Sequence, residues 1–371
     1  MSRKVRIKKF FREFESEWSQ HYWGFISRHL NEDLNWKRLS KCSYITQEII
    51  ENNLDLPWDV YWMSLNPNMT LKFVKKHSNW DWNWNFLSSV IPMKEILSNL
   101  DLHWSFMLMS RNKGLTMDII ESFPDKNWDW SSISLLPLVN MDVLNKYPKK
   151  IWNWFNISQN PGITFKDIFN NPDKTWHWYG IACNPNISIR TIIKHPRNLW
   201  CWNPISRNKN ITMEDIKQYP NKPWVWGQVS YNPNLTLDMV SNNYNESWNW
   251  DLVARNIKLT KEVISPDFPH ACPPPLLTNW EFMSENSSLT IELVEEFPNK
   301  PWVWRFISQN MFHREREALL LEKMKKHIAS YRIQQYYSKA LTNPYCDLGL
   351  RHANKCYDEI VELFNKRMDS L

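Results

Sequence analysis

Lysine recurs at one place in the repeating pattern of this chain, two residues before a tryptophan. A row of ammonium groups can contact phosphates or carboxylates, so these lysines are the candidate contacts for an anionic partner. The five positions are Lys126, Lys150, Lys174, Lys222 and Lys300. A lysine stem can also lie over an aromatic ring with its ammonium in water, and we prefer this interpretation. The net charge of +6 permits an anionic partner without requiring one.

Tryptophan supplies a second candidate chemistry, because indole faces can stack on nucleic-acid bases. The chain has 24 tryptophans, and Trp-x-Trp pairs begin every 24 residues from Trp128 to Trp248. Side chains that keep one phase in every repeat are typical of a repeating core, which we prefer to a stacking surface. The predicted core consists of Trp128, Trp130, Trp152, Trp154, Trp176, Trp178, Trp200, Trp202, Trp224, Trp226, Trp248, Trp250, Trp302 and Trp304.

Motifs for catalysis and cofactor binding are missing from the sequence. It contains no His-Glu-x-x-His, no Gly-rich phosphate loop and no Gly-x-Ser-x-Gly. Cys346, His352 and Cys356 lie close together but lack the spacing of a zinc finger, and we expect cysteines that pack between helices. His177 and His195 occupy repeat positions that other repeats fill with other residues, which indicates surface histidines. We predict a protein that is not an enzyme and has no cofactor or metal.

The residues around each tryptophan pair predict two short helices in every repeat. Phe165, Ile168, Phe169 and Pro172 have the spacing of one helical face, and a Thr164-x-x-Asp capping pattern precedes them. Proline ends this helix after about two turns. The half with the tryptophans also fits helical spacing and ends at Asn-Pro. A leucine-rich repeat is the competing interpretation, because 24 residues is within its usual length.

Helices of this length cannot stand alone in water, so they must bury against neighbouring repeats. The sequence therefore predicts an all-α protein, an α-solenoid of about twelve 24-residue repeats with a C-terminal helical cap. The expected organisation is a basic segment and capping unit at 1–27, repeats at 28–310 with an insertion at about 265–276, and a charged helical hairpin at 311–371. With only 6 glycines, turns that need a positive φ are expected to use asparagine.

Two segments outside the repeats carry further candidate contacts. A basic cluster near the N-terminus could touch nucleic acid, a membrane surface or an import receptor, although we prefer a solvated helix turn. Its residues are Arg3, Lys4, Arg6, Lys8, Lys9 and Arg12. The tail around Ile333-Gln334 faintly resembles a calmodulin-binding helix, and an amphipathic cap is preferred. No apolar run is long enough for a transmembrane segment, and the scattered cysteines indicate free thiols, so we expect a soluble intracellular protein.

Three phrases carry a family resemblance. NPDKTWHW at 171–178, NPNIS at 184–188 and NPNLT at 232–236 resemble tandem repeats of uncharacterised proteins from giant amoeba viruses of the mimivirus kind. The resemblance spans most of the chain. It implies a repeat protein made in the cytoplasm of an infected host cell, with the virion or the virus factory as further locations. It carries no activity and no catalytic residue over to this chain.

The leading hypothesis for function is a non-catalytic scaffold that binds an unknown protein partner through its extended face. Specificity would then depend on residues that vary, such as His177, Cys201, Val225 and Asn249 between the tryptophans of each pair. Two alternatives stay open. One is a structural component that self-associates in the virion or virus factory, and the other is a nucleic-acid-binding solenoid that uses the lysine row.

Overall fold

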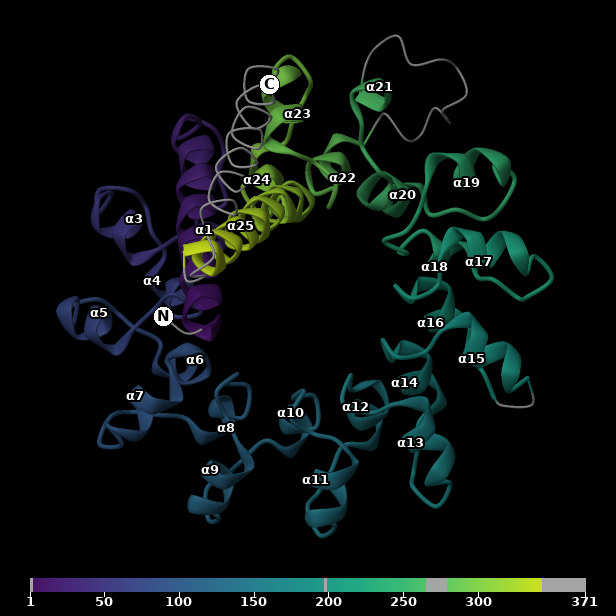
Figure 1. Cartoon of the computed structure of the whole chain (residues 1–371), viewed down its shortest axis with the longest axis horizontal. Coiled ribbons are helices and arrows are strands. Elements are labelled where there is room, and N and C mark those ends of the chain that lie inside the picture. The colour runs from purple at the N-terminus through teal and green to yellow at the C-terminus, as the bar shows by residue number, and fades with distance from the viewer. Residues whose placement is uncertain (1–2, 197–198, 265–278, 342–371) are drawn as a thin grey trace. The chain divides into compact units, whose positions relative to one another are not determined.

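The computed structural model describes residues 3–196, 199–264 and 279–341. The chain divides into two compact units, Met1–Phe312 and His313–Leu371. Every element assigned in the described residues is helical, and short helices recur in pairs through the first unit (Figure 1). The prediction of an all-α repeat protein is confirmed, and the leucine-rich alternative is wrong because its strands are missing from the described residues.

Each repeat begins with a first helix that nearly always starts at the second tryptophan of a pair or at the aromatic residue in its place. The first helices are α2 (Trp36–Ser40), α4 (Val60–Met63), α6 (Trp84–Val90), α8 (Phe106–Met109), α10 (Trp130–Ile133), α12 (Trp154–Gln159), α14 (Trp178–Cys183), α16 (Trp202–Arg207), α18 (Trp226–Val229), α20 (Trp250–Asn256), α22 (Trp280–Ser284) and α24 (Trp304–Ile307).

A second helix follows each of these except the last. The second helices are α3 (Gln47–Glu51), α5 (Leu71–Lys76), α7 (Met93–Leu97), α9 (Met117–Ser122), α11 (Met141–Lys146), α13 (Phe165–Asn170), α15 (Ile189–Lys194), α17 (Met213–Gln218), α19 (Leu237–Asn242), α21 (Lys261–Ile264) and α23 (Ile291–Glu296). Figure 1 shows the first helices on the inner side of the array and the second helices on its outer side. The predicted insertion at about 265–276 lies outside the described residues.

The residue between the two tryptophans is the N-cap of the first helix, and in several repeats its side chain caps that helix. In α12 the side chain of Asn153 accepts the N–H of Asn156 at 3.1 Å, which caps the helix. Ile157 of the same helix is fully buried. The helix ends before Asn160, whose backbone is extended (φ −69°, ψ 132°) because proline follows it.

Asparagine does not supply left-handed turns, so that prediction is wrong. In the described residues the only positive φ belongs to Phe312, at 44°. The turns use the asparagine side chain instead: Oδ1 of Asn160 accepts the N–H of Gly162 at 2.7 Å, and Oδ1 of Asn184 accepts that of Asn186 at 2.8 Å. This local bond lets ordinary backbone angles reverse the chain, so few glycines are needed.

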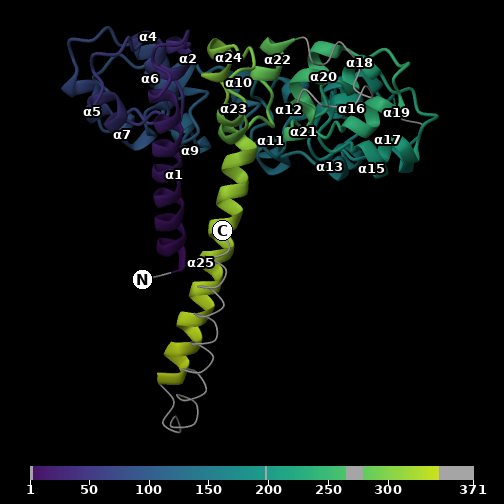
Figure 2. The same ribbon diagram turned by 90° about the horizontal axis from the view of Figure 1, so that it is seen from above.

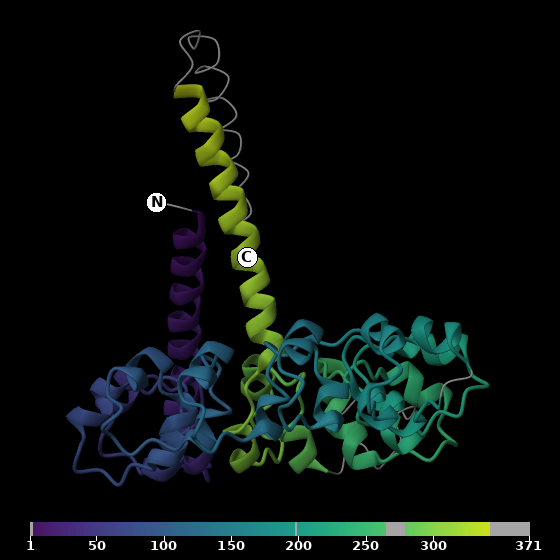
Figure 3. The ribbon, with the colours of Figure 1, turned by 90° about the horizontal axis from the view of Figure 1, so that it is seen from below.

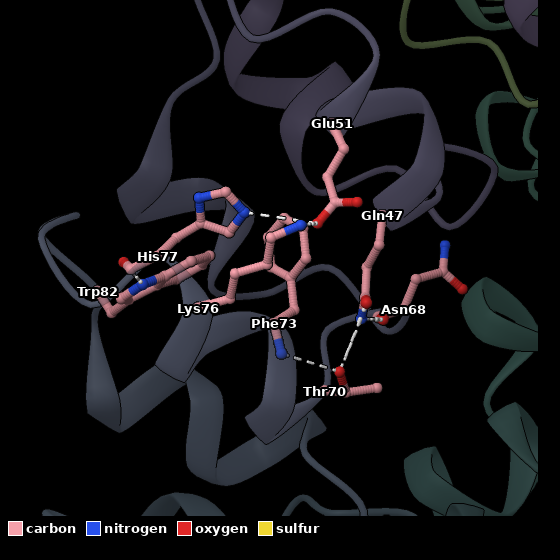
Figure 4. A network of polar contacts seen from close by, with 8 residues as sticks. All are labelled: Gln47, Glu51, Asn68, Thr70, Phe73, Lys76, His77 and Trp82. Carbon is pink, nitrogen blue, oxygen red and sulfur yellow. Dashed lines mark hydrogen bonds and ion pairs between the residues drawn. The ribbon is translucent and has the colours of Figure 1, made fainter.

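Polar side chains join neighbouring second helices, as Figure 4 shows for α3 and α5. Gln47 of α3 donates to the Thr70 hydroxyl at 3.0 Å, and the same hydroxyl caps α5. Lys76 lies 2.6 Å from Glu51 and lowers the pKa of that carboxyl through its hydrogen bond. In the same view the indole of Trp82 donates to the backbone of its own repeat (Figure 4).

Buried polar side chains join successive repeats at a fixed spacing. In most repeats a serine hydroxyl, directly after the buried aliphatic residue of the first helix, accepts a backbone N–H of the next repeat, as Ser134 does from Asn153 at 3.0 Å. The first Asn of each Asn-Pro-Asn turn reaches back to the previous repeat. Asn184 donates to the carbonyls of Ser158 at 3.0 Å and Asn160 at 2.9 Å. These groups are satisfied by hydrogen bonds, so their burial is tolerated and fixes the register of the stack.

The array closes on itself, because the end of α1 (Arg3–Ser27) supplies the second helix that α24 lacks. Ser308, in the last repeat, accepts the N–H of Asn35 in the first repeat at 2.8 Å, which is the usual bond between neighbours. Arg28 pairs with Glu295 at the positions where Lys146 pairs with Glu121 elsewhere. Closure therefore follows the rule of an internal junction, and the twelfth repeat is built from both ends of the unit (Figure 1).

The closing junction differs from the other junctions in the residue that makes one buried hydrogen bond. Cys42 stands where most later repeats have the buried asparagine, and its thiol, a weaker donor than an amide, donates to the Met311 sulfur at 3.7 Å. The Tyr22 hydroxyl of α1 takes over the bond of the asparagine and donates to the Ser308 carbonyl at 3.1 Å. Around it, Phe25 packs edge-on against Phe312 at 5.6 Å between ring centres. The end of α1, within the segment 1–27 predicted to hold a capping unit, thus completes a repeat.

The N-terminal half of α1 and the second unit lie outside the repeats. The N-terminal half of α1 extends away from the layer of repeats (Figure 2). In the second unit α25 (His313–Leu341) is one long helix (Figure 3), which agrees with the first helix predicted for the hairpin and contains Ile333-Gln334. The predicted second helix of the hairpin lies outside the described residues, as do Cys346, His352 and Cys356.

Candidate interaction surface on the first helices

The first helices present a row of variable side chains that the packing of the repeats leaves exposed. Two positions form this row: the residue after the second tryptophan, and the residue four further on, which lies at the C-terminal end of the first helix or just beyond it. From α8 to α18 we call this row the first-helix strip. Its residues are Met107, Arg111, Ser131, Leu135, Phe155, Gln159, Tyr179, Cys183, Asn203, Arg207, Gly227 and Tyr231.

Large apolar side chains in the strip are unusually open to solvent. The exposed fractions are 49% for Met107, 46% for Leu135 and 46% for Tyr231, against full burial of the aliphatic residues on the opposite face. The Phe155 and Tyr179 rings stack at 6.2 Å between centres, across the junction of α12 and α14. Exposed aromatic and apolar side chains on one surface are typical of surfaces that bind other proteins.

Gly180 allows the close approach of α12 and α14 behind these two rings. A Cβ atom there would lie 2.7 Å from the carbonyl oxygen of Phe155, closer than such atoms approach. The strip between these helices is therefore held in one arrangement by backbone contact.

Charge is sparse along the strip. The first helices α8, α10, α12, α14, α16 and α18 contain no acidic residue, and the charged members of the strip are Arg207 of α16 and Arg111 just after α8. Beyond the strip, Arg255 of α20 lies 3.0 Å from Glu285 of the following repeat. A surface with few charges costs little to desolvate, which favours a protein partner over a polyanion.

Three of the predicted anionic contacts lie against aromatic rings. The ammonium group is 5.1 Å from the ring centre of Phe106 for Lys126, 5.1 Å from Trp130 for Lys150 and 5.9 Å from Trp280 for Lys300. These are cation–π distances. Two predicted contacts do not share this arrangement: Lys174 pairs with Asp173 at 3.4 Å, and Lys222 is half-buried.

The two tryptophans of a pair have different surroundings. The first is buried or nearly so, and its indole N–H donates to a carbonyl five residues earlier, as Trp152 does to Tyr147 at 3.0 Å. The second is half-buried and lies edge-on to the first tryptophan of the next repeat. The pair Trp154–Trp176 is at 5.2 Å and 90°. Both rings are therefore engaged with the repeats, which leaves little of either face for bases.

The residues between the paired tryptophans, predicted to set specificity, lie at the N-caps of first helices. Asn249 accepts the N–H of Leu252 at 3.2 Å, and Nδ1 of His177 accepts that of Gly180 at 3.4 Å. Cys201 and Val225 make no such side-chain bond. His195 follows α15 and contacts the ring of Phe165 at 4.7 Å. His177, Val225 and Asn249 are exposed and Cys201 is half-buried, so these positions face solvent beside the strip, whose members lie two and six residues further along.

No helix among the described residues is both long and apolar enough to cross a membrane. No group of three or more His, Cys, Asp or Glu side chains in that part of the chain is placed to hold a metal ion. Asp129, which caps α10, has a pKa below its usual value because the Ser132 hydroxyl donates to its carboxylate.

Comparisons with protein-family models, with curated proteins and with solved structures find no match for this chain. The resemblance to giant-virus repeats therefore stays a prediction. The strip itself was missed from the sequence because its members share no residue type. The signal was present as variation at two positions four residues apart, within a pattern where the other positions repeat.

Proposed function

We propose that this protein is a non-catalytic scaffold that binds another protein through the first-helix strip. The observation that carries the proposal is the row of exposed apolar side chains, with Met107 and Phe155 on α8 and α12, Leu135 and Tyr231 just after α10 and α18, and no acidic residue in those helices. Interfaces are enriched in such aromatic and methionine side chains and depleted in charge at their centre.

Preorganisation supports the same proposal. Buried bonds such as those from Asn160 to the Ser134 and Leu136 carbonyls, at 2.8 and 2.9 Å, lock each repeat to the one before it. A surface that is already ordered loses little conformational entropy when a partner binds. The resemblance of the repeat phrases supports an infected host cell as the place of action, and a protein of that cell or of the virus as the partner.

The two alternatives have less support. Head-to-tail self-assembly through repeat ends would need an open end, whereas Ser308 and Asn35 already join the last and first repeats. Nucleic-acid binding would need free lysines, whereas Lys126, Lys150 and Lys300 lie over aromatic rings.

Quantitative affinity capture from infected cells tests the proposal when wild type is compared with surface variants. Phe155→Asp and Tyr231→Asp alter the strip, and Phe169→Asp is the matched control, an exposed aromatic on the second helix α13. We expect the strip variants to lose a partner that the control retains. Equal capture by all the variants would contradict a binding role for the strip, and a captured nucleic acid lost in high salt would favour the lysine row.

A further inference from the structure

A shallow groove of about 390 Å³ lies along the strip, from Gln159 of α12 past α14 and α16 to Tyr231 just after α18. Gln159, Cys183, Arg207, Lys209 and Tyr231 contribute to its walls, together with two prolines and Asn208. Arg207 and Lys209 are the charged residues of this lining, and both are exposed. The groove therefore combines two cations with an aromatic side chain and a thiol.

Neither cation has a carboxylate partner in the part of the chain that the structure describes. The Arg207 guanidinium lies 3.3 Å from the Tyr179 hydroxyl and 4.0 Å from the Cys183 sulfur, which are neutral contacts. The guanidinium carries five N–H donors in a planar fork that matches a carboxylate, so two such contacts leave capacity unused.

Another repeat of the same chain shows that a carboxylate can pair with an arginine at this repeat position. Arg255 stands at the position of Arg207 two repeats later, and the corresponding position of the repeat after it holds Glu285, 3.0 Å from the guanidinium. In the repeat after Arg207 the same position holds Tyr231. The partner carboxylate of Arg255 is thus replaced at Arg207 by an exposed aromatic ring.

We propose that this groove anchors an acidic side chain, Asp or Glu, of a peptide segment in the partner protein, with apolar neighbours of that side chain against Tyr231 and Phe155. The inference rests on the proposed function of the strip. A peptide carboxylate completes the arrangement that Glu285 completes for Arg255. A phosphate chain is disfavoured because α10, α12, α14 and α18 carry no cation that could follow it.

Selection from a phage-displayed library of random peptides on the full chain tests the proposal. We expect the enriched peptides to share an Asp or Glu beside aromatic or aliphatic residues. Selection on Arg207→Glu should lose this acidic preference. Arg255→Gln is the matched control, since it changes an arginine at the same repeat position that already has a carboxylate, and it should leave the enriched set unchanged.

Affinity of a synthetic enriched peptide gives the quantitative test by fluorescence anisotropy. Replacing its acid with the amide, or using Arg207→Gln, should weaken binding about tenfold, the usual loss for one charge-assisted hydrogen bond. Lys209→Gln serves as a second variant in case Arg207→Gln unfolds the repeat. Both variants are checked by circular dichroism.

The outcomes separate this proposal from the function on which it rests. Enriched peptides without an acid, bound less tightly by Phe155→Asp but equally by Arg207→Gln, would overturn the anchor and retain the strip. Failure to enrich any peptide that depends on Phe155 would overturn both. Displacement of the peptide by single-stranded DNA at low salt, lost in Arg207→Gln, would assign the groove to phosphate and overturn the carboxylate proposal.

Discussion

Replacing a single buried asparagine should destabilise the array by an amount that its hydrogen bonds allow us to work out. In Asn184→Leu the carbonyl of Ser158 loses a donor at 3.0 Å, and the N–H of Asn186 loses its acceptor at 2.8 Å. Each orphaned group costs about 1–2 kcal/mol. The Asn160 and Ile163 carbonyls also lose the amide, but each keeps a second donor, from the Ile163 N–H at 3.0 Å and the Asn186 amide at 2.9 Å. We expect a total loss of about 3 kcal/mol.

Urea unfolding followed by circular dichroism and tryptophan fluorescence measures this loss. The control is Asn186→Ala in the same turn, which removes two hydrogen bonds of an exposed side chain to Pro161 and Ile163. Water can replace those bonds, so the control should cost less than about 1 kcal/mol. A loss in Asn184→Leu no larger than in the control would refute the reasoning that the buried amide ladder joins the repeats.

Three further predictions concern the closing junction. Tyr22→Phe removes the hydroxyl that donates to the Ser308 carbonyl at 3.1 Å, so the free energy of unfolding should fall by about 1–2 kcal/mol. An unchanged urea midpoint would contradict a role of this hydroxyl in closure. Burial lowers the pKa of His29, so the folded state binds fewer protons than the unfolded chain. The free energy of unfolding should therefore fall as the pH drops below about 6.5. In His29→Phe the urea midpoint should depend less on pH than in the wild type, and identical pH profiles of the two proteins would disprove this. Burial raises the pKa of Cys42 to about 11, so iodoacetamide should modify it far more slowly than the half-exposed Cys183, as mass spectrometry would show; equal rates would mean that the junction opens freely.

Much of the repeat could be predicted because its signals are local. Prolines such as Pro172 follow the second helices, and a Thr164-type cap precedes them, as capping chemistry requires. The 24-residue period also predicted that successive repeats would bury each other's apolar faces. The role of asparagine was mispredicted, because composition cannot distinguish a residue that adopts positive φ from one whose side chain makes the turn.

Closure was beyond sequence reasoning for a different reason. The residues that close the array, Tyr22 and Ser308, are 286 apart, and a tyrosine of α1 makes the bond that a buried asparagine makes at other junctions. Whether a stack of repeats returns to its start depends on a small rotation at each junction, summed over the whole stack. No residue type reports that rotation. The exposed strip was missed for a related reason, since a surface becomes visible only once burial is known.

Amide hydrogen exchange at Asn35 tests closure most directly. Its N–H donates to Ser308 at 2.8 Å across the junction, whereas the equivalent N–H groups of Asn83 and Asn153 donate to the preceding repeat in the chain at 2.9 and 3.0 Å. A closed array predicts that Asn35 is protected to a degree similar to these two, and that Tyr22→Phe lowers its protection selectively. Exchange at Asn35 as fast as in an unstructured peptide, with Asn83 and Asn153 still protected, would contradict closure.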